Sequence, residues 1–351
     1  MSLRVDILGV ESLDLIDQVH QSSSRPLVYG SARYISFLLR ALSNVRLLCP
    51  TVWEGDTIVG TLPLLEQTAA DGQTVLNSLP FFGSHGGPCI STGSRDPSKL
   101  QEVLLQAAND IAEKQRAISL TIVESPLQPM DGSVAQVLGL EIIDDRIGQF
   151  TSLPYDATNV EEALFVKYHV KTRNAVRKGQ KLGQEFQRRK DQAAIDWLQS
   201  LHQESIASMG GVPKSRTVFA ELLEQFPLDS HARLYIGSCN GTMASGLLVL
   251  LFGDTVEYFT PVVDGFYKDQ QALSALIHHV MLETAREGFT CWNWGGTWRS
   301  QEGVYRFKNR FGASDMPYRY FHRLFDASLK SELPSNISTK FPYFYTFKHS
   351  S

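Results

Sequence analysis

One segment of the sequence combines residue types that can stabilise a developing negative charge. It runs from Trp292 to Ala313 and reads WNWGGTWRSQEGVYRFKNRFGA. Gly295 and Gly296 follow an aromatic strand end, and glycines at such a place let the backbone approach a ligand closely. A short helix is expected next, with Lys308 directly after Phe307. A cation held just past a strand end is well placed to stabilise an oxyanion.

The expected helix has recognisable ends and one apolar face. It starts near Gln301, where Ser300 can supply the N-cap, and Gly312 occupies the position of a C-terminal cap. Three apolar residues fall on one face at helical spacing: Val304, Phe307 and Phe311. We therefore expect Lys308 at the edge of this face. The alternative is a solvated helix whose lysine has no role.

This segment resembles the end motif of the Fem family, the aminoacyltransferases that build peptidoglycan interpeptide bridges, and of their wider acyltransferase relatives. The matching residues are Asn293, Gly295, Gly296, Thr297, Val304, Tyr305, Arg306, Phe307, Lys308, Phe311 and Gly312. The resemblance implies mixed α/β sheets in two tandem GNAT-like (N-acetyltransferase-like) domains, covering roughly residues 25–325. It also implies catalytic roles for Lys308 and Phe307. Substrate-binding roles follow for Tyr305, Gly295 and Gly296.

Composition and charge narrow the class of protein. At 351 residues the chain is long enough for two domains, and 43% hydrophobic with 20% charged residues is ordinary for a globular protein. A net charge of -4 argues against bulk nucleic-acid binding. No apolar run is long enough for a transmembrane helix, and early acids argue against a secretory signal. Four widely spaced cysteines favour a reducing cytoplasm and predict neither disulfides nor zinc.

Two segments carry the same strand, turn and strand pattern, Val45 to Leu65 and Ala232 to Leu251. Glycines recur at the same interval in both: Gly55 with Gly241, and Gly60 with Gly246. In each half a strand, a helix and a further strand follow, with first-half strands near 87–91 and at 118–124. Such a crossover predicts a parallel βαβ unit. We therefore expect a duplicated α/β fold, although a chance resemblance between two hairpins is the alternative.

The expected domain organisation follows from this repeat. Residues 1–155 form the first GNAT-like domain and residues 156–330 form the second, which carries the catalytic motif. Residues 331–351 form a turn-rich, then aromatic tail. The tail either packs back on a domain or helps to make a dimer, and the sequence leaves the oligomeric state open.

A glycine-rich loop lies between Leu76 and Ser91 and reads LNSLPFFGSHGGPCIS. It resembles a first-domain signature of the same family, in which S-L-P precedes G-G-P. The resemblance implies that His85, Gly86 and Gly87 bind substrate, and an imidazole there could also accept a proton. The alternative is that His85 is a surface histidine in a turn.

Nine Lys or Arg residues and one acid fall between Val166 and Lys190. Lys167 and Lys171 share one face of an expected helix that Gly183 ends. The family resemblance places a basic helix here that holds the acceptor's phosphates, a task that suits the planar fork of arginine. The implied residues are Lys171, Arg173 and Arg177. The alternative is a solvated basic face.

The acyl donor stays open between acyl-CoA and an aminoacyl-tRNA, with no tightly bound cofactor. The segment from Gly265 to Ile277 lacks the two glycines of the phosphate loop that acetyl-CoA-dependent GNAT enzymes usually have. The residues from Asp191 to His231 leave no room for the long helical arm of some Fem enzymes, which weakens the expectation of tRNA. Three carboxylates could accept the amine's proton: Asp254, Glu257 and Asp264. No motif for metal binding or a covalent nucleophile is present.

The sequence therefore predicts an acyl or aminoacyl transferase of the cytoplasm. Its acceptor would be an amine on a cell-envelope precursor, such as a phosphorylated or nucleotide-linked peptidoglycan intermediate, and charged tRNA is a possible partner. One alternative is an acyl-CoA-dependent N-acyltransferase of exopolysaccharide synthesis. Another is a non-catalytic ligand-binding module that keeps a degenerate GNAT fold.

Overall fold

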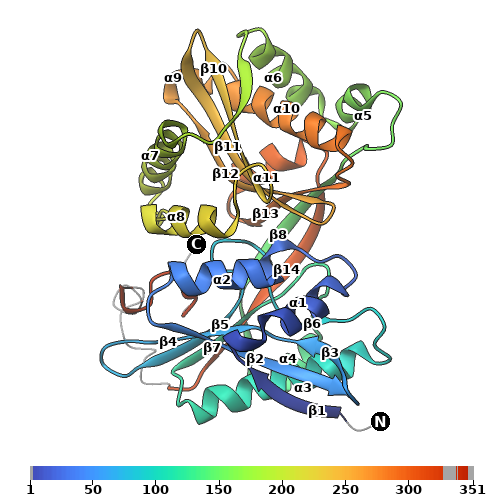
Figure 1. Cartoon of the computed structure of the whole chain (residues 1–351), viewed down its shortest axis with the longest axis vertical. Helices are drawn as coiled ribbons and strands as arrows, with labels where there is room; N and C mark the ends of the chain where they lie inside the picture. The colour runs from blue at the N-terminus through green and yellow to red at the C-terminus, as the bar shows by residue number, and fades with distance from the viewer. Residues whose placement is uncertain (1–2, 327–336, 338, 347–351) are drawn as a thin grey trace. The chain divides into compact units, whose positions relative to one another are not determined.

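The computed structural model describes residues 3–326, 337 and 339–346, which form two compact units (Figure 1). The first unit contains the described residues up to Ile147 and those from Met316 onward, and the second contains Gly148–Asp315. The strand at Ser314–Leu324 leads back to the first unit and pairs there with the strand at Ser119–Val123.

The first unit is built on a sheet whose strands follow the order β6-β3-β2-β4-β5-β7-β14, with β1 paired to β2. The strands are β1 (Leu3–Leu8), β2 (Val45–Glu54), β3 (Thr57–Thr61), β4 (Leu64–Thr68), β5 (Thr74–Ser78), β6 (Cys89–Ile90) and β7 (Ser119–Val123). The helices are α1 (Leu13–Gln21), α2 (Ala32–Ala41), α3 (Pro97–Lys114) and α4 (Gly132–Val137). Leu100 and Leu104 of α3 pack on Val52 of β2 in the core.

The second unit has the strand order β13-β12-β11-β10-β9. The strands are β9 (Glu185–Arg189), β10 (Ala232–Cys239), β11 (Thr242–Phe252), β12 (Thr255–Val263) and β13 (Cys291–Trp298). The helices are α5 (Val160–Lys167), α6 (Val170–Gln180), α7 (Gln192–Ser208), α8 (Arg216–Gln225), α9 (Gly265–Lys268), α10 (Ala272–Arg286) and α11 (Glu302–Asn309). Two strands carry the chain across the boundary of the units, β8 (Glu141–Ser152) and β14 (Ser314–Leu324).

The two units repeat one order of elements, as the sequence predicted. In the first, β2, β4 and β5 pair antiparallel, α3 crosses over, and β7 pairs parallel with β5. In the second, β10, β11 and β12 pair antiparallel, α10 crosses over, and β13 pairs parallel with β12. One detail of the prediction was wrong: the strand near residue 89 is the two-residue β6, which pairs antiparallel with β3. The parallel partner of β7 is β5 instead.

The local signals that set the element ends behave as expected. Asp96 caps α3 by accepting a hydrogen bond from the Lys99 backbone N–H, with Pro97 in the first turn. The β10–β11 turn uses Asn240 and Gly241 at φ of 50° and 79°, the left-handed region that two-residue hairpins require. No helix among the described residues is both long and apolar enough to span a membrane.

The described part of the C-terminal tail packs on the first unit. The rings of Phe344 and Phe81 lie 4.7 Å apart, and the backbone carbonyl of Tyr345 accepts a hydrogen bond from Thr121 Oγ1 at 2.6 Å. Lys340 pairs with Asp71 at 3.0 Å. These contacts favour the prediction that the tail folds back. Residues 331–336, 338 and 347–351 lie outside the described part.

Helices α6 and α10 of the second unit lie close together because Gly179 has no side chain (Figure 1). A Cβ added there would lie 2.5 Å from the Gln271 carbonyl oxygen and 2.7 Å from Ala275 Cβ. We expect Gly179→Ala to lower the free energy of unfolding by about 1–3 kcal/mol, since overpacking must push the helices apart. Urea denaturation measures this. A Cβ at Gly303 of α11 meets nothing within 4 Å, so Gly303→Ala should leave stability unchanged or slightly raised. Equal effects would contradict the packing argument.

Candidate active site

Helix α11 buries Lys308 together with part of the face that the sequence predicted. Lys308 is 6% exposed and Phe311 is 1% exposed, Phe307 is half-buried, and Val304 is 42% exposed. The N-cap is Gln301, with no side-chain hydrogen bond, so the expected cap at Ser300 was wrong. Gly312 does follow the helix in the left-handed region at φ of 78°. The helix therefore presents its lysine to the protein interior.

The Lys308 amine rests on the end of strand β13. Its Nζ donates to the Gly296 carbonyl oxygen at 3.1 Å and to Thr297 Oγ1 at 2.8 Å. The chain reaches this position through Gly295, whose φ is 74° and whose N–H donates to Asn293 Oδ1 at 2.9 Å. Within the described part of the chain, these two oxygens are the hydrogen-bond partners found for Nζ, and an ammonium has three N–H bonds.

Burial changes the acid–base behaviour of Lys308. Loss of hydration lowers the pKa of its amine from 10.5 to about 7, and no carboxylate among the described residues pairs with it. Its charged and neutral forms are therefore both populated near neutral pH. Perturbed groups of this kind are common in active sites, because catalysis needs a group that is poised to change state.

Aromatic side chains fix α11 on β13. The Trp294 ring lies 5.2 Å from Phe311 and 6.3 Å from Phe307, and the two phenylalanine rings are 5.3 Å apart. Trp294 Nε1 in turn donates to Thr151 Oγ1 at 2.8 Å. The helix is therefore held in one rotational setting, with Phe307 near Trp294 and Lys308 on the end of the strand.

Tyr305 lies on the same helix but has a protein partner. Its hydroxyl donates to Asp315 Oδ2 at 2.8 Å, and its backbone carbonyl accepts from Gln149 Nε2 at 3.4 Å. These bonds tie α11 to the strands around it. A direct substrate contact by Tyr305 stays a prediction.

A cavity of about 470 Å³ lies beside α11, wholly within the second unit. It is lined by Lys171, Thr172, Asn174, Ala175, Lys178, Gln271, Ser274, Gly303, Phe307, Arg310 and Phe311. Three of these residues are cations, two are phenylalanines and none is a carboxylate. Such a lining suits an anionic ligand with an apolar part.

The cavity also meets the N-terminal end of α10. Gln271 begins this helix in the left-handed region at φ of 67°, and no side chain caps the helix there. Ser274 Oγ donates to Gln271 Oε1 at 3.1 Å. An uncapped helix start directs backbone N–H groups and a partial positive charge toward a bound anion.

The predicted basic residues separate in the structure. Lys171 lines the cavity, but Arg173 donates from Nη1 to the carbonyls of Tyr168 at 2.7 Å and Phe165 at 3.3 Å, and so caps the end of α5. The guanidinium of Arg177 lies 5.4 Å from the centre of the Phe165 ring. The single helix expected from Lys167 onward is in fact two, since α5 ends at Lys167 and α6 begins at Val170. Phosphate binding by Arg173 and Arg177 stays a prediction.

The structure adds cavity residues that the sequence did not single out. Lys178 lies in the basic run, and its Nζ donates to the Asp269 carbonyl at 2.9 Å. Arg310 lies at a variable position inside the segment that carries the Fem-like motif, and it is brought to the cavity by the packing of the chain around α11. Gln271 and Ser274 carry no sequence signal, because uncharged polar residues at a helix start are common.

The glycine loop lies in the first unit and is packed rather than open. His85 is 2% exposed, with its ring 4.9 Å from Tyr318, so its interpretation as a surface histidine was wrong. A Cβ at Gly86 would lie 1.9 Å from the Leu79 carbonyl oxygen, and one at Gly87 would lie 2.8 Å from the Val123 carbonyl oxygen. Packing alone therefore requires both glycines. All three loop residues line a cavity of about 50 Å³, and their role in substrate binding stays a prediction.

The three carboxylates considered as proton acceptors lie in turns or in the core of the second unit. Asp264 caps α9 by accepting from the Phe266 N–H at 2.9 Å, and Asp254 accepts from Thr255 at 3.2 Å. Glu257 is fully buried in β12, opposite Asn293 of β13. None is found among the residues that line the larger cavity.

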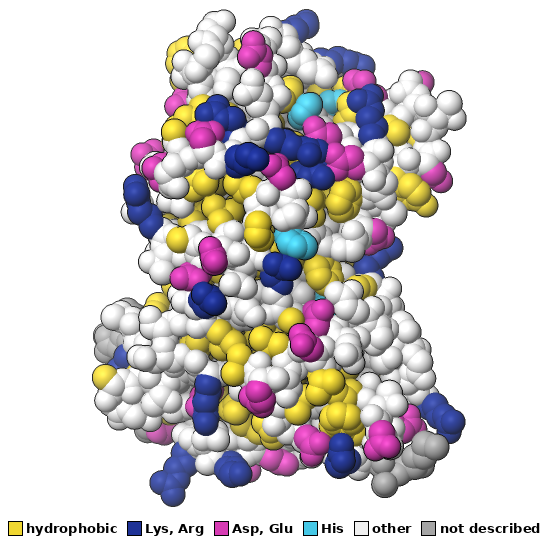
Figure 2. Space-filling model, in the orientation of Figure 1, with side chains coloured by type: hydrophobic (Ala, Val, Ile, Leu, Met, Phe, Trp, Pro, Cys, Tyr) yellow, Lys and Arg dark blue, Asp and Glu magenta, His cyan; other side chains and the backbone are white. Residues whose placement is uncertain are grey.

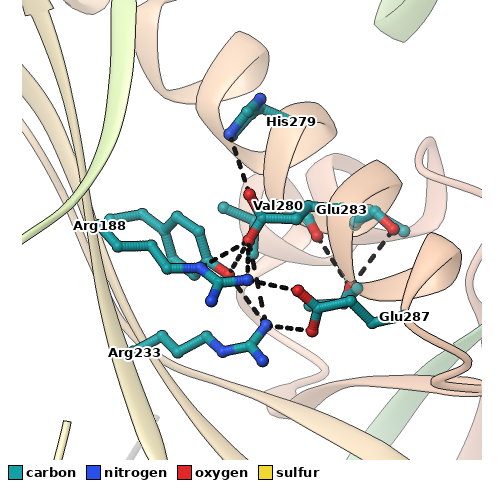
Figure 3. Close-up of polar contacts among 9 residues, drawn as sticks. Arg188, Arg233, His279, Val280, Glu283 and Glu287 are labelled. Carbon is teal, nitrogen blue, oxygen red and sulfur yellow. Dashed lines mark hydrogen bonds and ion pairs between the residues drawn. The ribbon is translucent and has the colours of Figure 1, made fainter. Parts of the chain in front are cut away.

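A cluster of charges near the C-terminal end of α10 holds that helix on the sheet (Figure 3). Glu283 and Glu287 face Arg188 of β9 and Arg233 of β10, with Arg233 Nη1 2.6 Å from Glu287 Oε2. Figure 2 shows basic and acidic side chains interleaved on the visible part of this unit, not a continuous basic surface. The two arginines balance the charge of the two glutamates, and these ion pairs hold α10 against β9 and β10.

The two adjacent histidines of α10 point to different surroundings, as expected for neighbouring positions on a helix. His278 Nδ1 lies 3.3 Å from the Tyr168 hydroxyl, whereas the His279 ring stacks on Phe186 at 4.7 Å. Among the described residues, no group of His, Cys, Asp and Glu side chains is arranged to hold a metal ion.

Comparison with known families identifies the kind of domain that carries this site. Residues 167–328 match the family model described as an acetyltransferase (GNAT) domain. This range contains α6, α10, β13 and α11, and hence the cavity and Lys308. The chain therefore carries a GNAT acetyltransferase domain, which supports the prediction that it is an N-acyltransferase. A search of curated proteins found no match.

Solved structures extend the likeness to the whole chain. The crystal structure of FemX has a TM-score of 0.70 at 13% identity, with 93% of this chain and 98% of that chain covered. A tandem GNAT protein from the clavulanic acid biosynthesis pathway, solved without AcCoA, has a TM-score of 0.54 at 14% identity, with 92% and 98% covered. At these identities the likeness shows the fold alone. It confirms the predicted tandem GNAT-like architecture.

Proposed function

We propose that this chain transfers an acyl group from an acyl-CoA thioester to an amine, with the donor bound in the cavity of the second unit. The observation that carries the proposal is the placement of this cavity beside α11, so that Phe307 lines it while Lys308 lies on the next position of the same helix. The cations Lys171, Lys178 and Arg310 match the charge of a phosphate-bearing thioester. The uncapped start of α10 adds a second source of positive potential.

In this proposal the reaction is a direct attack of the amine on the thioester carbonyl. The new C–N bond forms as the C–S bond breaks, the carbonyl oxygen carries negative charge in between, and the proton lost by the amine goes to the leaving thiolate to give the CoA thiol. The ammonium form of Lys308, already bound to Gly296 and Thr297, donates its remaining N–H to that oxygen. Phe307 excludes water beside it and keeps the helix in position.

The proposed acceptor is an amine on a phosphorylated or nucleotide-linked cell-envelope precursor. Its support is the likeness in fold to FemX and the Fem-like motif around Lys308. The likeness to a tandem GNAT protein whose description mentions AcCoA supports a CoA thioester as the donor. An aminoacyl-tRNA donor has no support in the cavity or the comparisons.

Gly303 offers a direct test of the donor site. It lines the cavity, and a Cβ added there meets no protein atom within 4 Å. We expect Gly303→Trp to raise the KM for acyl-CoA at least about tenfold without unfolding the protein, because the indole fills the space of the donor. Gly303→Ala is the matched control and should keep the KM. Calorimetric titration with CoA, and with charged tRNA in a parallel experiment, reports binding before any acceptor is known. An unchanged affinity of Gly303→Trp for CoA would remove the donor from this cavity.

A further inference from the structure

Strand β1 forms an edge of the first-unit sheet, beside β2 and near the N-terminus in Figure 1. Its six residues read LRVDIL and pair along their whole length with β2. On its other side no described strand pairs with it. An unpaired edge leaves a row of backbone N–H and C=O groups open to another strand. The segment contains neither proline nor lysine, the residues that natural edge strands commonly use to prevent such pairing.

The two faces of β1 differ in chemistry. Leu3, Val5 and Ile7 point to one face and are 37%, 40% and 47% exposed. This face continues the core, because Val5 pairs with Val52, which is fully buried. The exposed stripe is thus a part of the core surface that the described elements leave uncovered.

The opposite face carries one charge of each sign. Arg4 Nε lies 3.3 Å from Asp6 Oδ2, and both side chains are about half exposed. Arg4 also stacks its guanidinium 4.8 Å from the centre of the Trp53 ring. The two charges sit symmetrically on either side of Val5, which makes the strand complementary to a reversed copy of itself.

We propose that β1 pairs antiparallel with β1 of a second copy of this chain, about a two-fold axis at Val5. In this register Leu3 faces Ile7 of the second copy on the apolar side, and Arg4 faces Asp6 of the second copy on the charged side. Val5 meets its own equivalent. This one arrangement covers the exposed apolar side chains and pairs the opposite charges. Cross-strand pairs of both types stabilise antiparallel sheets.

Other registers are disfavoured by the same residues. Moving the axis to Arg4 or to Asp6 places like charges opposite one another. Moving it by half a residue sets charged side chains against the apolar stripe, because a slip of one residue reverses the faces. The pairing is small compared with a standard interface of roughly 20–30 residues a side. We therefore expect a weak, reversible dimer.

Charge reversal provides the test, with sedimentation velocity over a concentration series and no N-terminal tag. The wild type should show a concentration-dependent monomer–dimer equilibrium. Arg4→Asp alone and Asp6→Arg alone should each weaken dimerisation at least about tenfold, since each opposes like charges at two symmetric places. The double variant Arg4→Asp/Asp6→Arg should restore it. An equimolar mixture of the two single variants should form a heterodimer, because one strand is then all acidic and the other all basic. Circular dichroism checks that each variant is folded.

Two outcomes would overturn the proposal. One is a wild type that stays monomeric at every concentration. The other is a dimer that neither single reversal weakens, or whose loss the double variant and the mixture fail to repair, since its contact would then lie elsewhere. Val5→Lys adds an independent arm, because it places two ammonium groups at the axis and should abolish the dimer without touching Arg4 or Asp6.

Discussion

Replacing Lys308 by methionine should lower kcat by about 100-fold or more, the usual cost of losing one preorganised oxyanion donor. Methionine keeps the length and much of the volume of the side chain, so the aromatic packing of Trp294 against α11 should survive. The KM for the acyl donor should change little, because Lys308 is not among the residues that line the cavity. Steady-state kinetics with acyl-CoA and a competent amine acceptor measures both constants.

Arg306→Met is the matched control for this experiment. Arg306 is a cation on the same helix, but its side chain is exposed and its partner is the exposed Glu302. Its removal should leave kcat within about twofold. If Lys308→Met kept near-normal turnover, or if Arg306→Met lost as much, a specific role for the buried amine would be excluded.

The second large effect is a pH-dependent difference in stability between wild type and Lys308→Met. Folding lowers the pKa of Lys308 from 10.5 to about 7 through loss of hydration. Between these two values the unfolded chain holds a proton that the folded chain does not, so the stability of the wild type rises with pH. Below about pH 7 both states are protonated, and the full penalty for the buried charge is present.

The methionine variant lacks this penalty at every pH. We therefore expect it to be more stable than the wild type near pH 7, and the difference to shrink by about 3 kcal/mol as the pH rises to about 9.5. Urea denaturation of both proteins at several pH values gives the difference directly, and other titrating groups cancel in the comparison. A difference that stays constant with pH would mean that Lys308 keeps an ordinary pKa in the folded protein.

Much of the fold could be predicted because its signals are local. Asn240-Gly241 selects a tight hairpin, Asp96-Pro97 starts a helix, and Gly183 lies at a φ of 64° in the turn that follows α6. The repeat of these signals in both halves also indicated the duplication. The partner of β7 could not be predicted in the same way, since strand pairing depends on contacts far apart in the sequence.

The site was predicted in its residues but not in its orientation. Helical spacing grouped Val304 with Phe307 and Phe311 and placed Lys308 at the edge of this face. In the structure Phe311 packs against the Trp294 ring, and the helix is then rotated so that Lys308 points toward β13. Arg173 shows a related limit. Its guanidinium was predicted to bind phosphate, but it caps the end of α5. The reason is that the chain bends at Tyr168 and His169, where the sequence suggested a continuous helix.

The rotational setting of α11 has a consequence for how this sequence can vary. Phe307 and Lys308 are neighbours on one helix whose side chains point about 100° apart, so that Phe307 lines the cavity and Lys308 rests on the end of β13. A single insertion within α11 before Phe307 would place the phenyl ring of Phe307 on the strand carbonyls, move Lys308 to the exposed position of Asn309, and put Arg306 in the cavity. The number of residues before Phe307 in α11 is therefore constrained more strictly than the identity of those residues. A homologue that changes several of these amino acids can remain active, whereas one that gains or loses a single position should not.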